Sequence, residues 1–245
     1  MFENVKVIYF ISDVHLGSAG HSGSDREKLA KLSLLFGRMA GPGDRLFILG
    51  DLFDFWFEYR SVIQKEHLEI IRLLKDLRSR GVTVDLLVGN HDFWIGDFLS
   101  RELGITVHRQ PLALEAGGKK MFLAHGDGLG KGDLGYKMLK VVLRNPFTIW
   151  LYRLLHPDLA IPFAKWFSQV SRNHLTRDMH LDPGPMLEVA REKFAQGFDC
   201  VLLGHTHLPT VHEENGKIYI NLGDFIASFS YAVFRDGVLT LEYIK

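Results

Sequence analysis

Short, continuous apolar runs recur along the chain, and five of them stop at aspartate, asparagine or histidine. The runs lie at 9–11, 47–49, 86–88, 122–124 and 201–203, and each is followed within two residues by such a side chain. Runs that are apolar at every position are typical of strands buried on both faces, as in a sheet covered by helices. The pattern therefore predicts a layered α/β structure with polar groups at the strand ends.

The segments between the runs predict the remaining elements. Helical periodicity and glycine stops predict helices at 25–40, 62–80, 95–103 and 184–196. Strands are predicted at 5–12, 45–50, 83–89, 105–108, 112–116, 119–124 and 200–204. The chain after 204 predicts β-hairpins, with turns at Glu214-Asn215-Gly216 and Arg235-Asp236-Gly237.

Between residues 133 and 182 the strand signals vanish, and aromatic-rich helical segments replace them. This change predicts a helical insertion, 133–182, within a core formed by 1–132 and 183–245. Basic and aromatic residues alternate in it: Lys137, Lys140, Arg144, Phe147, Trp150, Tyr152, Arg153, Lys165, Trp166 and Phe167. Two interpretations stay open, a plain aromatic core and an amphipathic surface at a lipid interface.

The composition of the chain bears on its cellular location and its partners, but not on its reaction. The chain has 245 residues, 47% of them hydrophobic, and a formal net charge of zero, which gives no reason to expect nucleic acid as a partner. The one cysteine, Cys200, lies in an apolar run and is expected to be buried and inert. No secretory signal or membrane-spanning stretch is apparent, so we expect a cytoplasmic protein that can still touch a membrane surface.

The polar strand ends predict a metal site. Ligands of open α/β sheets bind beyond the carboxyl ends of the strands, so these side chains are expected to meet. The predicted ligands are Asp13, His15, Asp51, Asn90, His125, His205 and His207. Imidazole with carboxylate and amide oxygen suits Mn²⁺, Fe²⁺ or Zn²⁺ rather than Ca²⁺. Seven ligands suit two ions about 3.5–4 Å apart that share a carboxylate, which would be Asp51.

Other polar residues receive plainer interpretations. Asp54 is expected to support its loop and to bind no metal. The histidines without a strand-end setting are expected on the surface or in loops: His67, His108, His156, His174, His180 and His212.

Together these motifs resemble the calcineurin-like metallophosphoesterases. The resemblance rests on Asp13-x-His15, Gly50-Asp51-x-x-Asp54, Gly89-Asn90-His91-Asp92, His125-Gly126 and Gly204-His205-Thr206-His207. It implies a β-sandwich of two mixed sheets flanked by helices. It also implies one metal on Asp13, His15, Asp51 and His207, and another on Asp51, Asn90, His125 and His205.

The order ISDVHLG, ILGDLFDFW, GNHDFW, LAHGDGLGKGDLGYK, LLGHTHLP and NLGD is similar to the UDP-2,3-diacylglucosamine pyrophosphatases of lipid A biosynthesis. That family implies two divalent ions, with Mn²⁺ expected, a lipid-linked UDP-sugar substrate and peripheral contact with the cytoplasmic face of the inner membrane. Water would attack the α-phosphorus, which gives UMP and 2,3-diacylglucosamine 1-phosphate. The helical lid of the family corresponds to the insertion.

The resemblance also assigns roles to single residues. His91 would stabilise or protonate the leaving oxygen, and Asp92 would orient His91; the best-known branch of the family has arginine at the position of His91. The expected substrate contacts in the lid are Asp133, Tyr136, Ser171 and Arg172.

Two other functions stay open. One is a metal-dependent phosphodiesterase or phosphatase acting on another nucleotide or phosphate compound. The other is a binding module with a disused metal site, which is disfavoured because all seven ligand positions and His91 are filled.

Overall fold

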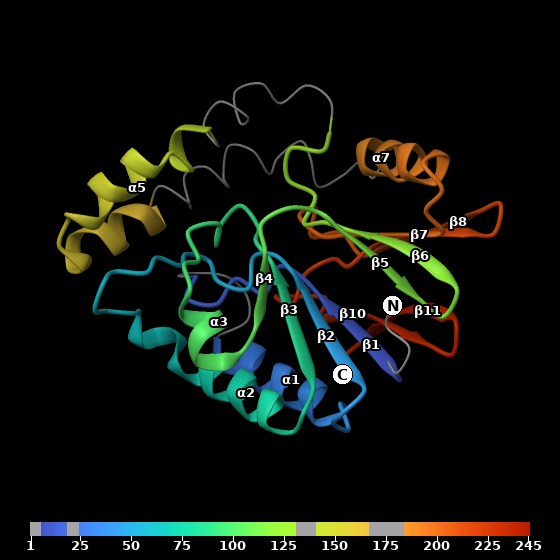
Figure 1. Cartoon of the computed structure of the whole chain (residues 1–245), viewed down its shortest axis with the longest axis horizontal. Helices are drawn as coiled ribbons and strands as arrows, with labels where there is room; N and C mark the ends of the chain where they lie inside the picture. The colour runs from blue at the N-terminus through green and yellow to red at the C-terminus, as the bar shows by residue number, and fades with distance from the viewer. Residues whose placement is uncertain (1–5, 19–24, 131–140, 167–183) are drawn as a thin grey trace.

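The computed structural model describes residues 6–18, 25–130, 141–166 and 184–245. Its strands form two sheets that lie face to face between layers of helices (Figure 1). The first sheet contains β1 (Val7–Ile11), β2 (Asp44–Leu49), β3 (Thr83–Leu87), β4 (Thr106–His108), β10 (Ser230–Arg235) and β11 (Val238–Tyr243), in the order β11-β10-β1-β2-β3-β4. The second contains β5 (Leu112–Ala116), β6 (Lys119–Leu123), β7 (Cys200–Leu203), β8 (Thr210–Glu214) and β9 (Lys217–Asn221), in the order β5-β6-β7-β9-β8.

Both sheets are mixed. Strands β1 to β4 run parallel and β10 and β11 add antiparallel neighbours, while β6, β7 and β9 run parallel between antiparallel β5 and β8. The predicted sandwich of two mixed sheets flanked by helices is confirmed.

Helices cover the outer face of each sheet (Figure 1). The first sheet is covered by α1 (Asp25–Gly37), α2 (Leu68–Ser79) and α3 (Phe98–Leu103), and a short 3₁₀ helix, η1 (Lys65–His67), precedes α2. The second is covered by α7 (Gly184–Ala195). Further helical segments, α5 (Pro146–Arg153) and residues 157–166, lie in the predicted insertion.

Alternate residues of each central strand enter different core layers, and this explains the continuous apolar runs. Tyr9 and Ile11 of β1 pack under the helices, whereas Ile8 and Phe10 pack between the sheets. In β7, Leu202 lies between the sheets and its neighbours Val201 and Leu203 pack against α7. Because successive strand residues point to opposite faces, a strand between two apolar layers needs an apolar residue at every position.

The predicted boundaries hold at most strands and shift by three residues or more at three helices. The 25–40 helix ends already at Gly37. The 62–80 helix begins only at Leu68, after the 3₁₀ turn. The 95–103 helix begins at Phe98, where the carboxylate of Glu58 accepts the backbone N–H groups of Gly96, Asp97 and Phe98 at 2.8–3.1 Å. A carboxylate that caps from a distant segment leaves no sequence signal at the helix itself.

Both predicted hairpin turns are confirmed. Asn215 and Gly216 have φ of 50° and 74°, and Asp236 and Gly237 have 52° and 80°. Two consecutive positive φ angles are what a two-residue hairpin of the favoured twist requires.

Cys200 is buried as expected, and burial raises the pKa of its thiol to about 11.

The prediction that His67 lies on the surface or in a loop is wrong. His67 is fully buried, with its ring against Phe53 and Trp56 and Nε2 3.2 Å from the carbonyl of Phe55. It therefore belongs to the core beside α2.

The insertion contacts the core through a group of aromatic rings. Tyr152 of α5 lies against Phe55, Phe57 and Trp94, with ring centres 4.7–6.1 Å apart. The Trp94 indole N–H donates to the carbonyl of Leu143 at 2.8 Å.

Among the described residues, no helix is long and apolar enough to cross a membrane. The expected boundaries at 133 and 182 lie outside the described residues.

Candidate metal centre

The polar side chains at the strand ends meet at one edge of the sandwich. The parallel register of β1, β2 and β3 places Asp13, Asp51 and Asn90 at the same end of the first sheet. Parallel β6 and β7 do the same for His125 and His205 in the second sheet. Backbone hydrogen bonds join the loops: Asp13 N–H donates to Gly50 at 3.2 Å and His15 N–H to Asp51 at 2.9 Å.

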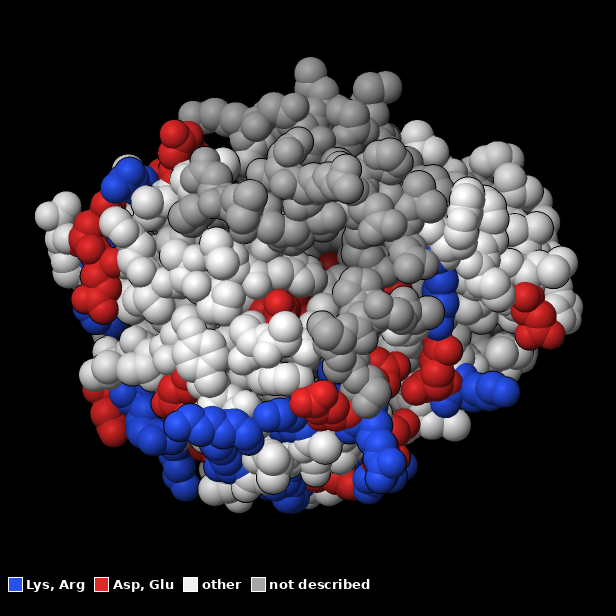
Figure 2. All heavy atoms as spheres, turned by 180° about the vertical axis from the view of Figure 1, so that it is seen from behind, with Lys and Arg blue, Asp and Glu red and all other residues white. Residues whose placement is uncertain are grey.

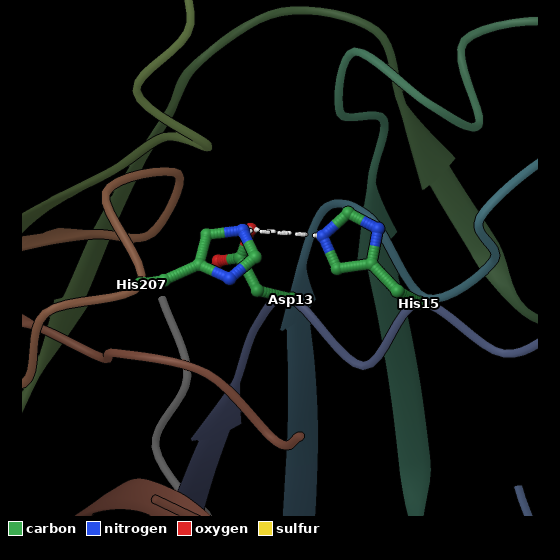
Figure 3. A group of neighbouring side chains, drawn as sticks. All are labelled: Asp13, His15 and His207. Atoms are coloured by element: carbon green, nitrogen blue, oxygen red, sulfur yellow. Dashed lines mark hydrogen bonds and ion pairs between the residues drawn. The ribbon is translucent and has the colours of Figure 1, made fainter. Parts of the chain in front are cut away.

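Asp13, His15 and His207 form the first group, and their side chains converge (Figure 3). Asp13 Oδ1 lies 3.4 Å from His207 Nε2 and 3.7 Å from His15 Nε2, and the two imidazole nitrogens are 3.3 Å apart. The three ligand atoms are therefore close enough to bind one ion.

Asp51 lies between this group and a second one. Its Oδ2 is 3.6 Å from His15 Nε2 and 3.3 Å from His125 Nε2, so it faces one histidine of each predicted ligand set. His125 Nε2 is also 2.8 Å from the amide oxygen of Asn90, and the ring of His205 is 5.2 Å from the ring of His125. The structure thus brings all seven predicted ligands together, with Asp51 at the centre.

The backbone around the site adopts a rare conformation. Five of the seven residues have positive φ, between 48° and 72°: Asp13, His15, Asp51, His205 and His207. For a non-glycine residue this region is strained, by about 1 kcal/mol or more for each position. Such strain persists where the surrounding structure enforces it, and here it turns each side chain toward the same point.

Burial and neighbouring charges shift the pKa values of the carboxylates and histidines of the site. Burial opposes the charge of Asp13 and Asp51, but facing histidines, His207 and His125 foremost, hold both carboxyl pKa values well below the usual range. Burial also opposes protonation of His15, yet Asp13 and Asp54 raise its pKa to about 9. In His205 and His207 burial dominates and lowers the pKa to about 4. Both carboxylates are therefore anionic and His205 and His207 are neutral, while the raised pKa values of His15 and His125 show that the carboxylates attract positive charge to this point. Carboxylate and imidazole are donors that a divalent transition metal binds.

One buried oxygen supports this interpretation directly. Asp13 Oδ1 is inaccessible and has no hydrogen-bond partner in the described residues, although its carboxylate is ionised. Its polar neighbours are the Nε2 atoms of His207 and His15, at 3.4 and 3.7 Å, and neither makes a hydrogen bond to it. A buried anionic oxygen that accepts no hydrogen bond is costly, and a metal ion bound by these three side chains would stabilise it. The residues present therefore fit divalent metal ions.

The carboxylate beside the ring of His91 is that of Asp54 and not, as expected, that of Asp92. His91 Nδ1 lies 2.9 Å from the carbonyl oxygen and 3.7 Å from the carboxylate of Asp54, whose Oδ1 is also 3.5 Å from His15 Nδ1. The Asp92 carboxylate instead accepts the backbone N–H groups of Leu52 and Gly89 at 2.9 and 2.8 Å. Asp54, which the sequence suggested only as loop support, is thus the residue beside His91, while Asp92 fastens the loops on either side.

Burial and the neighbouring charge of Asp51 raise the pKa of Asp92 to about 7. In the described part of the chain, the hydrogen bonds to the Asp92 carboxylate come from the backbone N–H groups of Leu52 and Gly89.

Further supporting residues have no motif of their own. Ser12 Oγ lies 2.5 Å from Asp13 Oδ2 and 3.0 Å from the Leu49 carbonyl oxygen, and its one hydroxyl hydrogen is available to either acceptor. The ammonium group of Lys28 is fully buried on α1 and donates to the His15 carbonyl at 2.8 Å. Asn221, at the start of the Asn-Leu-Gly-Asp segment, donates to the Gly204 carbonyl at 2.8 Å. A lysine in an amphipathic helix is usually exposed, so sequence reasoning missed Lys28.

The four expected lid contacts, Asp133, Tyr136, Ser171 and Arg172, lie outside the described residues.

Comparison with known proteins identifies the family of the chain. A family model described as calcineurin-like phosphoesterase matches residues 6–209. This chain belongs to that family. It is a metal-dependent phosphoesterase or pyrophosphatase, as the motifs predicted.

The chain is similar to curated relatives along most of its length. A UDP-2,3-diacylglucosamine hydrolase of Porphyromonas gingivalis is 31% identical over 256 residues, which cover 97% of each chain. A protein of the same description from Pseudomonas putida is 32% identical over 213 residues, which cover 84% of each. A solved structure of Yfce, a phosphoesterase from E. coli, is 16% identical with a TM-score of 0.47, and the match covers 98% of this chain and 93% of that one.

Proposed function

We propose that this protein is a dinuclear-metal hydrolase that cleaves the pyrophosphate of UDP-2,3-diacylglucosamine in lipid A biosynthesis. Water attacks the α-phosphorus, and the products are UMP and 2,3-diacylglucosamine 1-phosphate. The observation that carries the proposal is the convergence of seven metal-ligand side chains around Asp51. The likeness to a named UDP-2,3-diacylglucosamine hydrolase over 97% of both chains supports this substrate.

Two ligand sets around Asp51 would hold the ions, for which Mn²⁺ is expected. The first set is Asp13, His15, Asp51 and His207, and the second is Asp51, Asn90, His125 and His205. When bound, two such ions polarise phosphate oxygens and lower the pKa of bound water toward neutrality.

His91 is positioned for proton transfer. Its Nδ1 lies 2.9 Å from the Asp54 carbonyl oxygen, which can only accept, so Nδ1 carries a hydrogen. Nε2 is then the ring nitrogen that exchanges a proton with the substrate, and it donates to the leaving oxygen when the imidazole is protonated. The Asp54 carboxylate stabilises that protonated form, while its carbonyl fixes the orientation of the ring.

An Asp51→Ala variant tests the metal centre. We expect it to lose bound Mn²⁺, measured by elemental analysis, together with turnover of both UDP-2,3-diacylglucosamine and bis-p-nitrophenyl phosphate. Asp97→Ala is the matched control, because Asp97 is 71% exposed and forms a surface pair with Arg101. Retention of metal and turnover by the Asp51 variant would sink the scheme.

The same assay separates the two enzyme functions. Wild-type protein with Mn²⁺ should hydrolyse the lipid-linked UDP-sugar with a much higher kcat/KM than bis-p-nitrophenyl phosphate. If it turns over only the latter, the general phosphodiesterase alternative is the correct one.

We also propose peripheral contact with the inner membrane through the insertion. Large apolar side chains of α5 and residues 157–166 are more than half exposed: Phe147, Trp150, Leu151, Leu154, Leu159, Phe163 and Trp166. Figure 2 shows mainly uncharged residues at the right of the view, where the insertion lies, whereas Lys and Arg gather along the lower edge. An exposed apolar surface of this kind is typical of a protein or membrane contact.

Two basic residues of the insertion contact the core. Lys165 donates to Glu66 at 2.6 Å and to the Gly17 carbonyl at 2.9 Å, and Arg153 lies over the ring of Phe57. These two residues therefore tie the insertion to the core, and the lipid-facing surface would be mainly apolar.

Vesicle co-sedimentation tests this contact. We expect the double variant Trp150→Glu, Trp166→Glu to lose binding to vesicles of phosphatidylethanolamine and phosphatidylglycerol. Val238→Glu is the control, since Val238 is 60% exposed on β11, away from the insertion. Equal binding by all three proteins would exclude this surface as the membrane contact.

A further inference from the structure

A cavity of about 230 Å³ opens beside the metal-ligand residue His125. One wall is the connection from β4 to β5, which includes Arg109 and Gln110. Another is the segment after β6, which includes Asp127, and Arg144 of the insertion completes the lining. The cavity thus begins at the metal centre and extends toward the connection between the two sheets.

Arg144 gives the cavity its chemical character. Its guanidinium lies over the ring of Phe93, with Nη2 3.8 Å from Asp127 and 3.4 Å from the Gly89 carbonyl. Its Nε is buried and has no hydrogen-bond partner among the described residues. A guanidinium offers five N–H donors in a planar fork that matches phosphate oxygens, so a bound phosphate would satisfy the remaining donors.

The size and the lining exclude an acyl chain. Hydrocarbon buried against Arg144, Asp127 and His125 would remove charged groups from water without replacing their hydrogen bonds. The volume is also below the roughly 300 Å³ at which pockets for whole drug-sized ligands begin. The cavity therefore suits one polar, anionic part of a larger substrate.

We propose that this cavity holds the nucleoside monophosphate half of the substrate. Its phosphate faces His125 and Arg144, and its base faces the 108–111 loop. The amide of Gln110 has both donors and an acceptor, as recognition of a pyrimidine ring requires. This assignment rests on the proposed function, and it leaves the apolar surface of the insertion for the acylated half.

Binding of UMP to the Mn²⁺-loaded protein tests the proposal without any lipid. Isothermal titration compares UMP, uridine and inorganic phosphate on the wild type, Arg144→Gln and Gln110→Ala. We expect Arg144→Gln to weaken UMP at least tenfold and to weaken phosphate as well. Gln110→Ala should weaken UMP several-fold and leave phosphate unchanged. Arg101→Gln is the control, because Arg101 is exposed on α3 and pairs with Asp97.

Two results would overturn the proposal: UMP affinity that is unchanged in both variants, or inorganic phosphate that binds the wild type as tightly as UMP. Thermal unfolding checks that each variant is folded. Gln110 is exposed, so Gln110→Ala is expected to fold and still tests the proposal if Arg144→Gln does not fold.

Failure here is distinguishable from failure of the proposed function. Arg144-dependent UMP binding without turnover of UDP-2,3-diacylglucosamine counts against the proposed lipid substrate alone. Turnover of that substrate with Arg144-independent and Gln110-independent UMP binding counts against the cavity alone.

Discussion

The position of the Asp51 carboxylate depends on the absence of a side chain at Gly89. A Cβ at Gly89 would lie 2.1 Å from Asp51 Oδ1 and 2.7 Å from the Asp51 backbone nitrogen. Ordinary carbon contacts begin near 3.5 Å, so the carboxylate would have to move by roughly 1.4 Å. The backbone nitrogen cannot rotate away, and the two loops would have to separate as well.

This displacement exceeds what a catalytic site tolerates. Functional groups need to be held within about 0.5 Å of the productive geometry, and an error near 1 Å can reduce turnover about 100-fold. Overpacking of this kind also destabilises the fold by about 1–3 kcal/mol. We therefore expect Gly89→Ala to fold with a lowered Tm and to lose about 100-fold or more in kcat.

Mn²⁺-dependent hydrolysis of bis-p-nitrophenyl phosphate, metal content and thermal unfolding would be measured together. Gly37→Ala is the matched control, because a Cβ at Gly37 on α1 has nothing within 4 Å. The control should keep wild-type turnover and an equal or higher Tm, since alanine is the better helix former. Wild-type metal content and turnover in Gly89→Ala would refute the reasoning that close loop contact positions Asp51.

Two further predictions concern buried charges outside the ligand set. Burial alone would raise the pKa of Asp85, but hydrogen bonds from His108 and Arg45 outweigh it and lower the pKa. The ionised carboxylate therefore stabilises the fold above about pH 4, and this stability is lost as the pH falls through the lowered pKa. Asp85→Asn should cost about 3 kcal/mol at pH 7 in urea unfolding and less at pH 3; an equal cost at both pH values would contradict this. Lys28→Met should lower the unfolding free energy by about 1–3 kcal/mol and weaken Mn²⁺ binding in a calorimetric titration, because the His15 carbonyl loses its buried donor; unchanged metal affinity would show that Lys28 only stabilises α1.

The convergence of the predicted ligands follows from the sequence because the position of each side chain depends on a local rule. A strand buried on both faces is continuously apolar, and in a parallel sheet its carboxyl end lies beside those of its neighbours. Asp13, Asp51 and Asn90 therefore had to be close once β1, β2 and β3 were parallel. The two-sheet arrangement itself came from the family resemblance, since the strand pattern alone is equally compatible with one doubly wound sheet.

Residues that act across loops could not be predicted in this way. Asp54 and Asp92 follow similar glycine-containing turns, and only the folded loops decide which carboxylate faces His91 and which accepts backbone N–H groups. His67 has the sequence setting of an exposed helix start, but the rings of Phe53 and Trp56 cover it. In each case the deciding partner lies on a different turn or segment, where periodicity carries no information.

The loop that carries the predicted ligand Asn90 also contacts the insertion. Asp92 fastens its base to Leu52 and Gly89, and two residues further on Trp94 packs against Tyr152 and donates to the Leu143 carbonyl. Because His91 lies between the metal ligand and these contacts, any movement of α5 that displaces Trp94 acts on the same short loop that orients His91. The predicted metal centre and the apolar surface of the insertion are therefore connected through the five residues 90–94, so a change at one is expected to reach the other.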